Sequence, residues 1–332
     1  MHTLVFGGLR LLHHLKSSPN NVHWGYYDAK IPPVLHINSG DSVKVNTFSG
    51  DPKRLSDNGL NDDDIPLELK KIHDEVTDRG PGKHILFGPI FIKNAKPGNV
   101  LEIKFKKIIP SVSFGYNHFL PNSGTLPDDY PYSKIKIIKF QQKNNEYLAN
   151  FTKNIEIPLQ PFFGQLGVAP ALEQGRINSS PPSSHGGNLD NKELVQGSTL
   201  YLPVHVDGAL FSIGDGHAIQ GDGEVSISAL ETCMNGVIEL NLRKDLILNW
   251  PMAETQSHLI SMGLNSDLFE ASKMAVRNMI DYLTRYQNVD RDDAYHLSSV
   301  ALDLHVTQIV DGVKGVHGIL PKNIFKSHSR WL

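Results

Sequence analysis

Cysteine is almost missing from this sequence: Cys233 is the single one among 332 residues. One cysteine excludes an internal disulfide and any metal site built from clustered thiolates, so a metal ion would need imidazole and carboxylate ligands. A chain without disulfides fits a reducing compartment, and we therefore expect a cytoplasmic protein.

Long apolar runs and an excess of one charge are missing too. No apolar stretch approaches the roughly 20 residues that a membrane-spanning helix needs, so we expect no membrane partner. The formal net charge is -3, and the Lys and Arg residues are scattered rather than gathered in a stripe. This leaves no electrostatic footprint for nucleic acid, which we exclude as a partner.

Short runs of alternating apolar residues, bounded by turn residues, dominate the first two-thirds of the chain. Alternation with a period of two is typical of strands that bury one face. The sequence therefore predicts a sheet-rich architecture. The clearest strands are expected at 34–48, 84–92, 100–109, 134–140 and 198–204.

Helices are few. Ser266 is a candidate N-cap for one strong helix, whose apolar residues recur at spacings of three and four through Tyr286, and a second helix is expected over 292–304. The polar stretches 51–64 and 124–131 predict long loops. Histidines in polar or terminal contexts are expected at the surface, namely His13, His14, His73, His258 and His328.

The segment 185–231 combines dense glycine with acid, amide and imidazole side chains. Glycine is this frequent only where the backbone takes unusual angles or approaches a ligand closely. Asp215 and His217 are two residues apart and share one face of an extended chain, as do Asn188 and Asp190. Two such pairs brought together would offer nitrogen and oxygen ligands to a divalent ion.

Glu224 follows this run and is the candidate general base for a water molecule at such an ion. A purely structural interpretation stays open, because Asp-Gly and Gly-Asp-Gly are ordinary hairpin turns. A second constellation over 22–28 joins His23, three aromatic residues and Asp28. It either lines a pocket or closes the core with aromatic rings, and both interpretations remain open.

Long ordered motifs extend along nearly the whole chain. They are His23-Trp-Gly-Tyr with Asp28, His84 to Pro89 with Gly98, Gly115-Tyr-Asn, Gly124-Thr-Leu-Pro-Asp-Asp129, Phe163-Gly-Gln-Leu-Gly-Val-Ala-Pro170, His185-Gly-Gly-Asn-Leu-Asp190, Gly214-Asp-Gly-His217, Gln220-Gly-Asp-Gly-Glu224 and Ala294-Tyr to Gln308-Ile-Val-Asp311. In these motifs the chain resembles the acetamidase/formamidase family.

The resemblance implies a mainly β (α+β) fold with jelly-roll-like or β-sandwich sheets and a few helices, the longest at about 266–286. It also implies hydrolysis of a carbon–nitrogen bond in a small linear, non-peptide amide, with release of ammonia and a carboxylic acid. Members of the family act on formamide, acetamide, lactams or indole-3-acetamide. Homo-oligomers and a divalent metal ion, zinc or alternatively calcium, are implied as well.

With the resemblance in place, roles can be assigned to the candidate residues. Glu224 is expected to move the proton, and His185 and Asn188 are expected to support a ligand or to stabilise the oxyanion. The metal ligands are expected among His23, Asp28, Asp190, Asp215 and His217.

Two positions depart from the family pattern. Residues 1–12 precede the point where such proteins usually begin, and Ser226 stands where many relatives carry a cysteine. Cys233 is a poor substitute, because no neighbouring cation lowers its pKa. The expected organisation is an N-terminal extension and first strand at 1–22, one catalytic unit at 23–320, and a tail at 321–332. A division into two β subdomains near 150–165 is left open.

Two rival interpretations remain at this point. In the first, hydrolysis needs no metal, and Asp, Glu and a lysine such as Lys192 activate water or form a covalent intermediate. In the second, the same β scaffold is a ligand-binding or structural module without amidase activity.

Overall fold

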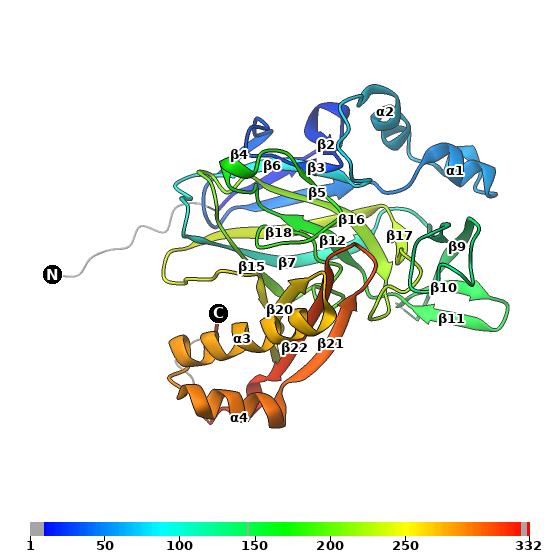
Figure 1. Ribbon diagram of the computed structural model, residues 1–332. Helices are drawn as coiled ribbons and strands as arrows, with labels where there is room; N and C mark the ends of the chain where they lie inside the picture. Colours follow the sequence, from blue (N-terminus) through cyan, green and yellow to red (C-terminus); the bar gives the residue numbers. More distant parts are fainter. Residues whose placement is uncertain (1–9, 145, 327–330) are drawn as a thin grey trace.

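The computed structural model describes residues 10–144, 146–326 and 331–332. Strands dominate these residues, and most of them belong to two large sheets, with the helices placed at the periphery (Figure 1). The predicted mainly β fold is confirmed.

The first sheet has nine strands in the order β1-β5-β18-β7-β15-β19-β20-β22-β21. All its pairs are antiparallel except β1 with β5. Its strands are β1 Leu12–Leu15, β5 Ser42–Thr47, β18 Met234–Arg243, β7 Val100–Pro110, β15 Thr199–Pro203, β19 Met252–Glu254, β20 His258–Asn265, β22 Lys314–Pro321 and β21 Asp303–Gln308.

The second sheet has eleven strands. Eight follow the order β11-β10-β9-β8-β17-β16-β12-β14, and β6 joins β16 to β2 and β4. These strands are β11 Ile155–Pro158, β10 Glu146–Thr152, β9 Lys134–Lys143, β8 Phe114–Phe119, β17 Leu230–Thr232, β16 Phe211–Ile219, β12 Phe162–Gly167, β14 Gly186–Asn188, β6 Ile85–Ile92, β2 Val22–Trp24 and β4 Leu35–Ile37. A separate pair joins β13 Ile177–Asn178 to β3 Tyr26–Tyr27.

The main hydrophobic core lies between the two large sheets. Strand β5 alternates buried with more exposed residues, so Val43 and Val45 reach the core, where they belong to one cluster with Phe163 of β12. A Cβ added at Gly236 of β18 would lie 2.9 Å from the Phe163 ring. The absence of a side chain at Gly236 thus lets the two layers of the sandwich approach closely.

Four α-helices and four short 3-10 helices complete the described chain. Helix α3 packs on β20 of the first sheet: a Cβ at Gly263 of β20 would lie only 1.9 Å from the backbone oxygen of Ala271. The helices are α1 Pro52–Asp57, α2 Leu67–Glu75, α3 Leu268–Tyr286, α4 Arg291–Ala301, η1 Pro19–Asn21, η2 Asp62–Asp64, η3 Leu172–Gln174 and η4 Lys322–Ile324.

The ends of both C-terminal helices differ from the prediction. Asp267, not Ser266, caps α3, because the Asp267 carboxylate accepts a hydrogen bond from the Glu270 backbone N–H at 2.9 Å. The second helix ends at Ala301 rather than continuing to residue 304. Strand β21 begins at Asp303 and pairs with β22, so sheet pairing replaces the last helical turn.

The predicted loop at 51–64 is partly wrong. Asp51 caps α1 by accepting a hydrogen bond from the Arg54 backbone N–H at 2.8 Å, and Pro52 follows in the first helical turn. An N-cap Asp followed by Pro is typical of a helix N-terminus. The polar composition of the segment nevertheless predicted a loop. The loop predicted at 124–131 is confirmed. Among the described residues, no helix is both long and apolar enough to cross a bilayer.

Candidate active site

A cavity of about 570 Å³ opens beside the second sheet, near helix α1. Aromatic and apolar side chains form part of its wall, including Trp24, Phe48 and Tyr116. The cavity is also lined by a group of acidic residues from distant parts of the chain, namely Asp190, Asp215, Glu224, Glu231 and Asp311.

His217 lies beneath these carboxyl groups and is only 1% exposed. Strand β16 places Asp215 and His217 on the same face, as the two-residue spacing predicts. The His217 Nε2 atom lies 3.2 Å from Asp215 Oδ2, 3.4 Å from Glu231 Oε2 and 3.9 Å from Asp190 Oδ1. One buried ring nitrogen therefore faces three carboxyl groups.

Gln220 determines which nitrogen of His217 carries a hydrogen. The Gln220 Nε2 amide donates to the backbone oxygen of Asp190 at 2.7 Å, so its Oε1 faces His217 Nδ1 at 3.0 Å. Since Oε1 can only accept, Nδ1 must donate. The lone pair of a neutral His217 then lies on Nε2, directed at the carboxyl groups. This arrangement requires a positive charge between them, supplied by a proton or by a metal ion.

The electrostatics of the cluster agree with this requirement. Burial alone would lower the pKa of His217, but the nearby Glu231 and Asp215 outweigh it and raise that pKa well above its usual value. Burial, together with Glu224, raises the pKa of Asp190 well above its usual range. Burial also raises the pKa of Glu231 and of Asp311 to about 7. So much negative charge is not stable here without a cation.

Several oxygens of the cluster are buried without a hydrogen-bond partner anywhere in the described chain. They are both carboxyl oxygens of Asp190, Oε2 of Glu224 and Oδ2 of Asp311. Buried polar atoms are otherwise almost always paired, so unpaired carboxyl oxygens point to an ion or ligand among them. The donor set consists of oxygens with one imidazole nitrogen, which suits a divalent cation.

Backbone geometry also marks this cluster. Asp190, Asp215 and Glu224 adopt φ angles of 45°, 57° and 45°, in the left-handed region that residues with side chains rarely occupy. Each such residue costs on the order of 1 kcal/mol or more, and such strain gathers at functional sites. Strain at three acidic residues of one cavity indicates that their side-chain positions matter more than local stability.

Gly164 of β12 leaves the space that the cluster needs. A Cβ at this position would lie 2.4 Å from Asp190 Oδ1 and 2.7 Å from Asp215 Oδ2. Any side chain here would therefore enter the volume between the carboxylates. The glycine of this sheet strand keeps a small space open beside the acids.

Asn188 lines the cavity next to the acids. Its side-chain oxygen accepts a hydrogen bond from Gln165 Nε2 at 2.7 Å, and Gln165 accepts one from the Tyr27 hydroxyl at 3.0 Å. Because the oxygen of Asn188 is held in this way, its NH₂ group faces the acids, where it donates a hydrogen bond to the Asp311 carboxyl.

The structure does not bring the other candidates into this cluster. His23 is buried outside the cavity wall, with Nδ1 bonded to the Tyr26 backbone oxygen at 2.7 Å and Nε2 to the Ser212 hydroxyl at 2.9 Å. Both ring nitrogens are thus engaged. Asp28 lies in a turn, where it accepts a hydrogen bond from the Lys30 backbone N–H.

His185 and Lys192 are not among the residues that line the described cavity. The buried His185 ring packs edge-on against Tyr27, and burial lowers its pKa to about 3. Lys192 forms an ion pair with Asp222 at 2.9 Å. The thiol of Cys233 is buried, which raises its pKa to about 12 and leaves it unsuited to nucleophilic attack.

Sequence reasoning missed several residues of the site. Glu231 ended the highlighted segment without receiving a role, and Asp311 has the appearance of an ordinary turn residue before Gly312. His73, predicted at the surface, lines the cavity and accompanies His84 and His118 there. The remaining surface predictions include His328, which falls outside the described residues.

The model of the acetamidase/formamidase family matches residues 12–177 and 173–327. The chain belongs to the acetamidase/formamidase family. The recognition made from the sequence motifs is thereby confirmed.

Individual members of the acetamidase/formamidase family support the same conclusion. The formamidase of Methylophilus methylotrophus is 22% identical, over 85% of this chain and 84% of that protein. The solved acetamidase of Yersinia enterocolitica is 29% identical with a TM-score of 0.82, over 96% of this chain and 94% of that one. The solved acetamidase of Bacillus halodurans is 28% identical with a TM-score of 0.79, over 97% of this chain and 100% of that one.

Membership in the acetamidase/formamidase family makes this chain an amidohydrolase that acts on carbon–nitrogen bonds other than peptide bonds. An enzyme is therefore favoured over a scaffold that has lost its chemistry. The acidic cluster around His217 is the part of the structure best suited to such hydrolysis, because it combines bases, a buried imidazole and an adjoining cavity.

Proposed function

We propose that this amidohydrolase cleaves a small linear amide, such as formamide or acetamide, into ammonia and a carboxylic acid. The observation that carries the proposal is the buried His217 Nε2 atom among the carboxyl groups of Asp190, Asp215 and Glu231. The names of the similar proteins, formamidase and acetamidase, support the same chemistry.

The proposal includes a divalent cation, zinc or alternatively calcium. Two overlapping groups have ligand atoms within 4.8 Å of one another: Asp190, His217 and Glu224, and Asp215, His217 and Glu231. His23 and Asp28 are left out of this ligand set, because they lie away from the cluster. The bound ion would supply Lewis acidity, polarising the amide carbonyl and making a bound water molecule more acidic.

Glu224 is the proposed general base. Its Oε2 is buried without a hydrogen-bond partner in the described structure, and burial raises the pKa of the carboxyl well above its usual value. A carboxylate with a raised pKa holds a proton more firmly and therefore accepts one from water more readily. The Glu224 backbone has a φ of 45°, in the left-handed region, which is typical of residues at functional sites.

The atoms and protons of the proposed reaction balance with water, the amide and Glu224. The water oxygen bonds to the amide carbon, and Glu224 takes a water proton. One N–H of Asn188 is bonded to Asp311, and its second N–H would donate to the carbonyl oxygen as negative charge develops there. The carbon–nitrogen bond then breaks, and Glu224 returns the proton to the departing nitrogen. Ammonia and a carboxylic acid result, and Glu224 regains its starting state.

The cavity volume informs the choice of substrates for a test. Acetamide has only four non-hydrogen atoms, while a cavity of 570 Å³ falls within the range of roughly 300–1,000 Å³ that holds drug-sized ligands. Bulkier amides therefore belong in the assay beside the smallest ones.

The direct test is ammonia release from formamide, acetamide and indole-3-acetamide, together with ring opening of a γ-lactam to its γ-amino acid, with the Glu224→Gln variant as the control. We expect release from at least one linear amide and its loss in the variant. Release from none of these amides would overturn the proposed substrate class, and equal release by the variant would overturn the role of Glu224.

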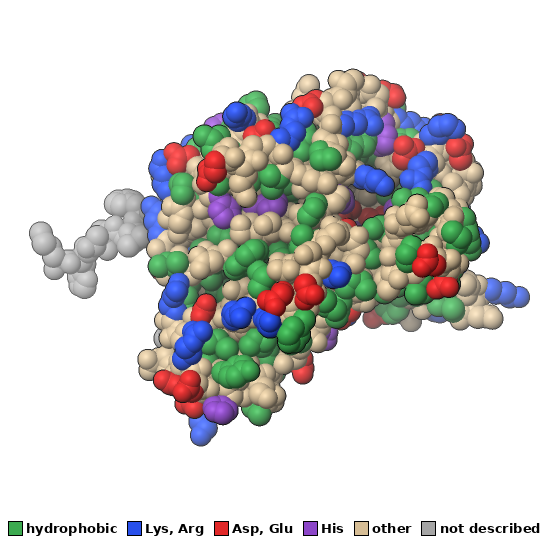
Figure 2. All heavy atoms as spheres, in the orientation of Figure 1, with side chains coloured by type: hydrophobic (Ala, Val, Ile, Leu, Met, Phe, Trp, Pro, Cys, Tyr) green, Lys and Arg blue, Asp and Glu red, His purple; other side chains and the backbone are tan. Residues whose placement is uncertain are grey.

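Assembly and location complete the proposal. We propose a homo-oligomer in the cytoplasm. Exposed apolar side chains support the homo-oligomer, since Tyr295 and Val300 of α4 are 66% and 82% exposed. Figure 2 shows hydrophobic groups at the surface of the lower part of the molecule, where Figure 1 places α3 and α4. Sedimentation of the wild type and of Val300→Asp tests it, and a monomer at micromolar concentration would contradict it.

A further inference from the structure

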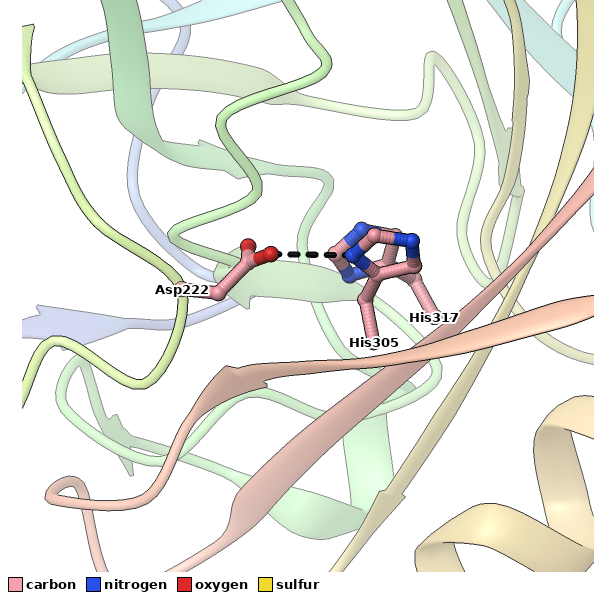
Figure 3. Close-up of side chains that lie close together, drawn as sticks. All are labelled: Asp222, His305 and His317. Carbon is pink, nitrogen blue, oxygen red and sulfur yellow. Dashed lines mark hydrogen bonds and ion pairs between the residues drawn. The ribbon is translucent and has the colours of Figure 1, made fainter.

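We propose a second cation-binding site, outside the active-site cavity, formed by Asp222, His305 and His317. These residues come from the turn after β16, from β21 and from β22. Figure 3 shows the Asp222 carboxyl group directed at the overlapping rings of His305 and His317, and the ligand atoms of the three residues lie within 4.8 Å of one another. This site is argued from its own geometry and does not depend on the proposed amide chemistry.

The pairing of β21 with β22 brings the two histidines together. His305 and His317 are direct partners in the register, so their side chains stand on the same face of the sheet. Their rings stack with centroids 5.1 Å apart and an angle of 18° between the planes. The strand pairing thus holds two imidazoles side by side on one face of the sheet.

His317 is prepared for a ligand by its surroundings. The residue is fully buried, and its Nδ1 atom lies 2.7 Å from the Thr307 hydroxyl. Nε2, in contrast, has no hydrogen-bond partner in the part of the chain that the structure describes. If the Thr307 oxygen accepts from Nδ1–H, the lone pair lies on Nε2, which is the tautomer that binds metals through this atom.

Asp222 already forms an ion pair with a positively charged side chain. Its Oδ2 atom lies 2.9 Å from the Lys192 ammonium and 2.9 Å from His305 Nδ1. The ammonium shows that the site accommodates a cation, and it would compete with a metal ion for this carboxylate. Asp222 and His305 are partly exposed, with side chains 27% and 37% accessible, so an ion can enter from solvent.

Two imidazoles and one carboxylate, with a further position open to water, are the ligand set of zinc and of related first-row ions rather than of calcium or magnesium. The backbone N–H of Gly223 donates to the Thr307 oxygen at 3.1 Å, so the turn that carries Asp222 also rests on β21. A bound ion would therefore fasten this turn, which leads into Glu224, to the C-terminal strands.

The test counts metal ions and does not measure activity. The background is the Asp190→Asn, Glu224→Gln double variant, which weakens the active-site cluster. After chelator treatment it is titrated with Co²⁺, followed by absorption spectroscopy and by metal analysis of the desalted protein. We expect one bound ion with imidazole ligands, and its loss on adding His305→Ala. His296→Ala, which removes an exposed histidine of α4, is the matched control and should change nothing.

Two further variants sharpen the result. Thr307→Val keeps the shape of the side chain and should weaken Co²⁺ binding about 10-fold to 100-fold, as loss of a group that orients a ligand does. Lys192→Met removes the competing ammonium and should strengthen binding about tenfold. Equal binding by the background protein and by its His305→Ala form, or no binding by either, would overturn the proposal. Neither result would bear on ammonia release by the wild type.

Discussion

At the residue scale, the central feature is the orientation of His217. Gln220 fixes Nδ1 as the donor, and three carboxyl groups surround Nε2. A buried neutral imidazole would direct its lone pair at negative charge, which is unfavourable at short range in a low-dielectric environment. His217 is therefore stable in this position only with a cation at Nε2, either a proton or a metal ion.

Replacement of Glu224 by Gln tests the proposed base at the same scale. The variant keeps the size and one oxygen of the side chain but cannot take a proton at neutral pH. We expect the turnover number for the best amide to fall by about 10²-fold to 10⁴-fold, with the melting temperature unchanged or raised. The melting temperature should not fall, because the substitution removes a buried carboxyl group.

The matched control for this prediction is Glu173→Gln, which alters an exposed glutamate. Comparable losses of turnover in the two variants would mean that the decrease does not come from the position of Glu224 in the cavity.

How much of the site could be predicted follows from where its residues lie along the chain. Asp190, Asp215, His217 and Glu224 lie within one glycine-rich segment, so spacing and composition alone gathered them. Asp311 lies beyond two helices and enters the cavity only through sheet packing, which no local pattern reveals. His23 is the opposite case: its motif is conspicuous, but its ring nitrogens bond the backbone oxygen of Tyr26 and the hydroxyl of Ser212.

At the element scale, strand β12 is the support on which the acids rest. Its residues are buried throughout, and Gly164 faces Asp190 and Asp215 without a side chain between them. Strand positions with a clear alternation were predicted well. Short strands such as β14 and β17 were not, because they are held by neighbours in the sheet rather than by their own sequence.

Gly164→Ala is the element-scale prediction. The new methyl group would lie 2.4 Å from Asp190 Oδ1, closer than atoms can approach, so the acids must shift. We expect amide turnover to fall by about 100-fold or more and divalent cation binding to weaken, as measured by ammonia release and by calorimetric titration.

Gly221→Ala provides the comparison for this change, since a Cβ there meets nothing within 4 Å. That variant should behave as the wild type does. If Gly164→Ala also retained wild-type turnover, the packing role of β12 would have to be abandoned.

At the scale of the whole molecule, the buried acids that the proposed function needs also lower the stability of the folded chain. Burial raises the pKa of Glu231 from 4.5 to about 7 in the folded chain without a bound cation. Between these values the folded state binds more protons than the unfolded state, so the free energy of unfolding falls as pH rises. The loss amounts to about 1.4 kcal/mol for each unit of pKa shift and is complete above about pH 7.

Thermal unfolding of chelator-treated protein between pH 4.5 and pH 8 checks this linkage. We expect the wild type to lose stability relative to Glu231→Gln across pH 4.5 to 7, and a saturating divalent cation to reduce the difference. A wild type that gains stability relative to Glu231→Gln as pH rises through this window would disagree with the raised pKa.

The organisation of the chain also belongs to this scale. One hydrophobic cluster includes residues from Leu15 to Leu264, on both sides of the division considered near 150–165. The single catalytic unit at 23–320 stays a prediction. A sheet-rich fold was predictable because several strands lie in alternating runs, while the sandwich arrangement was implied only by the family resemblance. Helix α1 was missed because its start signal lies in a polar stretch.

The most direct measurement of the central claim is the rate of ammonia release from the best amide by chelator-treated protein, before and after a divalent cation is restored. The proposed site predicts that the rate falls by at least about 100-fold on removal of the ion and returns when it is added to the wild type, but not when it is added to Asp190→Asn. A metal-free wild type that hydrolyses the amide at its full rate would contradict the claim.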